Sequence, residues 1–259
     1  MDAVPSLQQL LTQTIGLFVI GVVVYLMTRW LQFKRELWIF PNPRQSAIVA
    51  LMVTALPMFI IIVIAVIMSA KGGATEVNVE EKHSISNVFN QLIIYLVLFS
   101  PVLIAMKIRN EPWKSAGVTK INLGKSFLLG GLLGLVAIAT CAECLRGISS
   151  GLKMSHMWAF LQFSIVGIGE EFGYRGYLQT RLVAWLGRWQ GWILASVLMA
   201  TIHISGLVLV SGKDALTALL SSAMLIPISL LMGYIMLRTE NVIAPAILHT
   251  IADWVGIFT

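Results

Sequence analysis

Long apolar runs alternate with short polar segments along the whole chain. A helix needs about 20 mostly apolar residues to cross the hydrocarbon core of a membrane, and windows of that kind recur from end to end. We therefore predict an all-α fold, a polytopic membrane helix bundle with about eight transmembrane helices. The predicted spans are about 13–33, 47–69, 88–108, 126–147, 157–177, 191–210, 214–237 and 241–258.

The composition agrees with a membrane protein. The chain is 58% hydrophobic and only 12% charged, whereas about 25% of residues are charged in a soluble domain. Eight spans and their loops use nearly all of the 259 residues, so we expect a single integral membrane domain over 1–259. Residues 1–13 contain no Lys or Arg, which predicts a retained first helix rather than a cleavable signal peptide.

The distribution of Lys and Arg predicts the orientation. Most basic residues follow spans 1, 3, 5 and 7, whereas loop 70–87 is net acidic. Both termini are therefore expected outside, with the basic loops in the cytoplasm, and we expect a prokaryotic cell membrane. The net charge of +6 follows from this asymmetry. Membrane lipid is an expected partner and nucleic acid is not, because no basic and aromatic stripe stands apart from the spans. The sequence does not indicate an oligomeric state.

Six ionisable side chains fall inside predicted spans 5, 6 and 8. A charged side chain at the bilayer centre costs roughly 2.5–3.5 kcal/mol, so such residues face a bundle interior or a cavity and mark a function. Two adjacent glutamates in one apolar helix are the strongest case. The six residues are Glu170, Glu171, Arg175, His203, His249 and Asp253.

Their spacing predicts which of them are neighbours. Glu171 and Arg175 are i,i+4 and can form an ion pair on one helix face. Glu170 is rotated by about 100° from Glu171 and can face a separate cavity. His249 and Asp253 are also i,i+4. Simpler roles stay open at this point, namely a structural ion pair, a packing histidine at 203 and a helix-internal hydrogen bond between His249 and Asp253.

This set of groups suits hydrolysis of a peptide bond. A carboxylate beside a histidine can take a proton from water and later donate it to the leaving amine. A second histidine with a polar neighbour can stabilise the oxyanion. A catalytic divalent metal could use the same residues, Glu170, His203, His249 and Asp253, since two histidines and a carboxylate are a common zinc set.

Three short motifs resemble those of the CPBP (ABI) family of intramembrane proteases, which includes the Rce1-type CaaX prenyl endopeptidases. Glu170-Glu171-Phe-Gly-Tyr-Arg175 is similar to its E-E-x-x-x-R motif. Met199-Ala-Thr-Ile-His203 and His249-Thr-Ile-Ala-Asp253 are similar to its F-x-x-x-H and H-x-x-x-N motifs. The resemblance covers a core at 157–258, and the spans before it match only in being helical.

The resemblance implies a glutamate-type intramembrane endopeptidase without a required metal or other cofactor. Its substrate would be a peptide or protein in or at the membrane, including the prenylated CaaX type. Glu170 would activate water with the help of His203, and His249 and residue 253 would line the oxyanion site. Glu171 belongs to the same catalytic set, and Arg175 gives structural support.

Two residues depart from the family pattern. Met199 replaces an aromatic residue, which indicates a packing change. Asp253 replaces the usual Asn, and an ionised Asp would repel an oxyanion. We hypothesise that Asp253 is protonated in low-dielectric surroundings; otherwise it orients His249 or binds a metal.

Arg175 and the basic loop after span 5 place the predicted site toward the cytoplasmic half. Two other functions use the same residues. A non-enzymatic bacteriocin-immunity-type membrane protein would keep the fold without hydrolysis. A proton-coupled transporter would use the buried Glu and His residues as a relay.

Overall fold

The computed structural model describes residues 7–35, 38–70, 83–209 and 211–258, and every regular element within them is a helix. Most of the predicted acidic loop 70–87 lies outside the described residues. The elements are α1 (Leu7–Trp30), α2 (Pro43–Ala70), α4 (Ile85–Ile108), η1 (Trp113–Ala116), α5 (Leu123–Ala139), α6 (Ala142–Ser149), α7 (Met154–Glu170), η2 (Glu171–Gln179), α8 (Thr180–Leu186), α9 (Arg188–Leu209), α10 (Ala215–Ala223), α11 (Ile226–Thr239), α12 (Ile243–Val255) and η3 (Gly256–Phe258).

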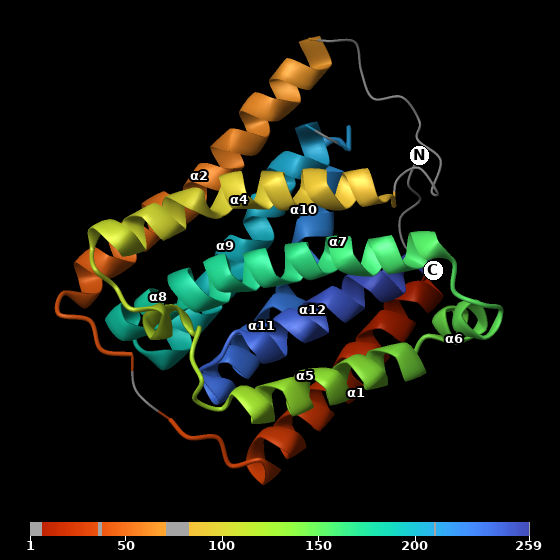
Figure 1. Cartoon of the computed structure of the whole chain (residues 1–259), viewed down its shortest axis with the longest axis horizontal. Coiled ribbons are helices and arrows are strands. Elements are labelled where there is room, and N and C mark those ends of the chain that lie inside the picture. The colour runs from red at the N-terminus through yellow and green to blue at the C-terminus, as the bar shows by residue number, and fades with distance from the viewer. Residues whose placement is uncertain (1–6, 36–37, 71–82, 210, 259) are drawn as a thin grey trace.

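One helical path runs through the middle of the bundle. Helices α7, η2 and α8 follow one another without a loop, and α4 and α12 pack on two sides of α7 (Figure 1). Helix α5 covers α12, and α1 packs on α5. Helices α2, α9 and α11 surround η2 and α8. The central path therefore contacts both the N-terminal and the C-terminal parts of the chain.

The helices support an integral membrane protein, although they do not confirm the predicted number of eight spans. Each predicted span contains helix. Within the described residues, four helical segments are long and apolar enough to cross a membrane, and five if α5 and α6 form one bent span. The four are Pro43–Ile60, Ile85–Ile108, Arg188–Leu209 and Ala215–Thr239.

Two predicted spans differ from a straight α-helix. The span predicted at 126–147 is not one straight helix, because α5 and α6 meet at 90°. Thr140 caps this corner by donating its hydroxyl to the Val136 carbonyl at 2.9 Å, and the Cys141 sulfur accepts from the Cys144 N–H. The span predicted at 157–177 changes at Glu171 from an α-helix to a π-helix.

Large apolar side chains cover the outside of the bundle. Phe18 of α1, Phe89 of α4 and Leu135 of α5 are 71%, 60% and 62% exposed. Apolar surfaces of this kind favour aggregation in water and are expected where a protein contacts lipid tails. The outward apolar faces thus agree with the membrane location predicted from composition.

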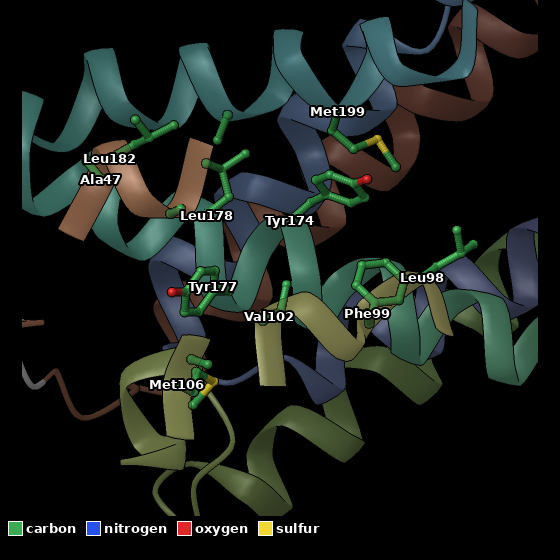
Figure 2. Close-up of a cluster of buried hydrophobic side chains, with 13 residues drawn as sticks. Ala47, Leu98, Phe99, Val102, Met106, Tyr174, Tyr177, Leu178, Leu182 and Met199 are labelled. Carbon is green, nitrogen blue, oxygen red and sulfur yellow. The ribbon is translucent and has the colours of Figure 1, made fainter. Parts of the chain in front are cut away.

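The largest buried cluster joins α4 to the central path. Phe99 and Val102 of α4 pack against Tyr174 and Leu178 of η2, as Figure 2 shows. The rings of Phe99 and Tyr174 meet edge to face with centroids 6.0 Å apart, a favourable arrangement for aromatic pairs. This cluster holds α4, a helix from the N-terminal half of the chain, beside the glutamate pair.

Polar contacts join the loops at one end of the bundle. The Lys34 N–H donates to Asn122 Oδ1 at 3.0 Å, and Arg181 pairs with Glu111 at 2.5 Å. Asn241 Nδ2 donates to the Thr119 carbonyl at 2.8 Å. The predicted basic loops therefore meet at the same end, and the side of the membrane that this end faces stays a prediction.

Helix α5 touches α12 at glycines. A Cβ at Gly130 would lie 2.9 Å from Ile247 Cβ and 3.0 Å from the Ala244 carbonyl oxygen. A Cβ at the neighbouring Gly131 would meet nothing within 4 Å. Small residues at such contacts let membrane helices approach closely.

We expect Gly130→Ala to lower the free energy of unfolding by about 1–3 kcal/mol, because the new methyl group overpacks the α5–α12 contact. Gly131→Ala is the matched control and should be neutral or stabilising by up to about 1 kcal/mol, since alanine favours helix. Thermal unfolding of both purified variants in the same detergent measures the difference. Equal stability of the two variants would contradict this packing.

Candidate active site

The π-helix η2 positions the charged residues. It spans nine residues, and two of its polar side chains hydrogen-bond to α11. Arg175 Nη2 donates to Ser229 Oγ at 3.2 Å, and Gln179 Nε2 donates to the Gly233 carbonyl at 2.9 Å. Such i→i+5 turns inside α-helices are frequent at functional sites. Here the turn begins immediately after Glu170, at the second glutamate.

Glu171 is completely buried and has two charged neighbours. Its Oε2 lies 3.4 Å from Nε of Arg175, whose side chain is only 1% exposed. Its Oε1 lies 2.9 Å from His249 Nδ1. The predicted Glu171–Arg175 pair is confirmed, and the contact to His249 links that pair to α12.

Glu170 faces a cavity instead of the ion pair. Tyr95 of α4 donates its hydroxyl to Glu170 Oε1 at 2.8 Å. The other oxygen, Oε2, has no hydrogen-bond partner among the described residues. It lies 3.9 Å from both His203 Nε2 and His249 Nε2. One carboxylate oxygen is thus held by a neighbour, while the other lies between two imidazoles.

The partners of the two histidines indicate their ring orientation. His203 Nδ1 lies 2.9 Å from the Met199 carbonyl, which only accepts, so Nδ1 carries the proton. His249 Nδ1 makes the corresponding contact with Glu171. Both Nε2 atoms then point toward Glu170, and His249 Nε2 also lies 3.5 Å from Asp253 Oδ2. Both rings are therefore oriented by a partner on the far nitrogen.

A cavity of about 330 Å³ brings all six predicted residues together. Apolar side chains of α9, α11 and α12 complete its walls, among them Met199, Ile228 and Met232. The His203 side chain is 32% exposed, so packing does not enclose it. The acidic and basic groups that sequence reasoning selected from three spans thus share one mostly apolar pocket.

Two residues of the site were missed by sequence reasoning. Tyr95 lies in a span without an acidic residue, and Ser229, which carries no charge, contacts Arg175 from α11. A signal for Tyr95 does exist, because polar residues recur at helical spacing before it in α4. Gly169 leaves room for the Tyr95 ring beside α7, because a Cβ at position 169 would lie 2.5 Å from Tyr95 Cδ1.

The geometry offers no ready metal centre in the part of the chain that is described. No three His, Cys, Asp or Glu side chains there are arranged to hold an ion. That no cofactor is required, with a divalent metal as the alternative, stays a prediction.

Comparison with known proteins finds a family match in the C-terminal part of the chain. Residues 153–255 match the family described as type II CAAX prenyl endopeptidase Rce1-like. The C-terminal segment of this chain is Rce1-like. The match confirms the resemblance inferred from the three motifs, and the Rce1-like segment contains all six predicted site residues. No curated protein and no solved structure matches the chain. Tyr95 lies outside the Rce1-like segment.

We expect Arg175→Met to destabilise the protein by about 3–5 kcal/mol, because it leaves Glu171 buried beside one fewer positive group. Arg146→Met is the matched control. It breaks the Arg146–Glu143 pair, whose side chains are 75% and 51% exposed, and such surface pairs contribute about 0–1 kcal/mol. Unfolding of both variants in detergent compares the two losses. If Arg175→Met lowers the free energy of unfolding no more than Arg146→Met does, the buried pair does not stabilise the fold.

Proposed function

We propose that this protein is an intramembrane endopeptidase of the glutamate type, which hydrolyses a peptide bond of a membrane-associated polypeptide. The observation that supports this most is Glu170 Oε2, buried and 3.9 Å from the Nε2 atoms of His203 and His249. The matched family is described as CAAX prenyl endopeptidase, so a prenylated CaaX-type segment is one candidate substrate. The proposed location is a prokaryotic cell membrane, with both termini outside.

In the proposed reaction Glu170 acts as the base. A separation of 3.9 Å is too long for a direct hydrogen bond and suits a water that bridges the carboxylate and an imidazole. Glu170 Oε2 accepts a proton from this water while the water oxygen bonds to the peptide carbonyl carbon. The C–N bond then breaks, and the proton passes from Glu170 to the leaving amine. Tyr95, through its bond to Oε1, keeps Oε2 turned toward the water.

His249 and Asp253 are proposed to stabilise the oxyanion. Glu171 holds His249 Nδ1, so the Nε2 side faces the cavity. An imidazolium at His249 would donate from Nε2 to the oxyanion, and a protonated Asp253 would donate beside it. Glu171 touches neither water nor carbonyl in this scheme and acts as a positioning residue.

We expect Glu170→Gln to abolish cleavage, because an amide cannot accept the proton of water. The measurement compares protein N- and C-termini in cells that express wild type or Glu170→Gln at equal level. Glu143→Gln is the matched control, because the same change falls on a half-exposed residue outside the cavity. Termini that depend on Glu170 and not on Glu143 would identify a substrate. Unchanged termini with a folded Glu170→Gln would favour an immunity-type or transport function.

We expect Asp253→Asn to keep or raise the cleavage rate, because Asn donates a hydrogen bond to the oxyanion without charge. Asp253→Leu should lower the rate by about 10²–10³, the usual loss for one oxyanion donor. Both values can be measured in proteoliposomes, as cleavage rates on the substrate that the comparison of termini identifies. Complete loss in a folded Asp253→Asn protein would show that the carboxylate itself is required.

A further inference from the structure

A second, larger cavity adjoins the catalytic one. Its volume is about 900 Å³, and it lies between α4, α7 and α12. It shares Val166, Ala252 and Asp253 with the catalytic cavity. Its far wall reaches His83, just before α4, and Ile257, just after α12. The cavity therefore leads from Asp253 to the end of the bundle where α4 and α7 begin.

One wall of this cavity is a polar stripe on a membrane helix. Asn87, Asn90, Gln91 and Tyr95 follow at i, i+3, i+4 and i+8 and share one face of α4. The first three line the large cavity, and Tyr95 donates to Glu170. The polar stripe thus runs from the end of the helix to the catalytic carboxylate.

The other face of the same helix is apolar. Phe89, adjacent to Asn90 and at the same depth, is 60% exposed and belongs to no wall of either cavity. Carboxamides on a membrane helix are costly against lipid and are expected where water or a polar partner meets them. The stripe is therefore a second polar site rather than a part of the lipid surface.

Helix α7 supplies the facing wall. Gln162 is 9% exposed and lines the cavity. Its Oε1 lies 2.5 Å from His83 Nδ1, so this pair joins the start of α4 to the middle of α7 across the cavity. Among the described lining residues Asp253 is the only acid, and there is no Lys or Arg. The polar lining residues of the cavity are mainly neutral carboxamides, which both donate and accept hydrogen bonds as a peptide group does, and apolar side chains such as Phe163 and Ile257 complete the walls.

We propose that this cavity is the substrate entrance and that its carboxamides hold an extended polypeptide segment of the substrate, which arrives from the end where α4 and α7 begin. Carboxamides can pair with the backbone of any sequence, so they suit a polypeptide segment whatever its side chains are. The inference rests on the proposed peptidase function and specifies its substrate. With the orientation predicted from Lys and Arg, this entrance opens outside, opposite the basic loops.

Thiol labelling tests the entrance without requiring activity. The probe is a charged, membrane-impermeant maleimide added to whole cells, with Cys141→Ala and Cys144→Ala removing the native cysteines. Asn90→Cys should react about tenfold or more faster than Phe89→Cys, because thiolates form in water and not in lipid. Equal rates at the two positions, or labelling of Asn90→Cys only after permeabilisation, would overturn the proposal.

Cleavage rates test the occupant. The double variant Asn90→Leu/Gln91→Leu should cleave the substrate found by the termini comparison roughly tenfold more slowly, since two backbone hydrogen bonds are lost. Phe89→Leu is the matched control and should cleave at the wild-type rate. A wild-type rate in the double variant, with Glu170→Gln inactive, would overturn the entrance and leave the peptidase standing. Equal cleavage by wild type and Glu170→Gln would instead overturn the proposed glutamate-type mechanism, and labelling would still decide the entrance.

A competing substrate class gives a distinct result. If only the prenylated form of a peptide is cleaved, and the double variant cleaves it at the wild-type rate, the polypeptide occupant is wrong. If both forms are cleaved at similar rates and the double variant slows both, the cavity binds the peptide backbone as proposed.

Discussion

The burial of Glu171 is the constraint on which the rest of the site depends. Its side chain has no exposed surface, and an isolated carboxylate in such surroundings carries a cost of several kcal/mol. Arg175 on one side and His249 on the other compensate it. A buried pair of this kind adds little net stability, so its consequence is geometric. The contact to His249 fixes the ring that faces Glu170, and it joins η2 to α12.

Close approach of helices is the second requirement. Lipid tails supply no hydrophobic driving force between membrane helices, so packing and hydrogen bonds must hold them together. Gly167 and Gly169 of α7 leave room for α12 and α4 respectively. A Cβ at Gly167 would lie 3.0 Å from the Ala246 carbonyl oxygen. Glycine therefore brings both neighbours of α7 within reach of the glutamate pair.

The N-terminal helices are part of the site as well as its scaffold. Helix α4 lies outside the Rce1-like segment, yet Tyr95 makes the only hydrogen bond to the Glu170 carboxylate among the described residues. The same helix forms the polar wall of the larger cavity. A description limited to the three motifs would contain the reacting groups and omit what orients and surrounds them.

The sequence by itself determined the membrane class, the six ionisable residues and their local pairs. Those inferences depend on the cost of charge in lipid and on helical spacing, and both act over a few residues of chain. Only the tertiary structure decided the π-helix at Glu171, the corner between α5 and α6, the role of Tyr95 and the direction in which the cavities lead. Tyr95 and Glu170 are 75 positions apart, and Glu171 and His249 are 78 apart. Contacts at that separation follow from how whole helices pack, because no local pattern specifies which faces will meet.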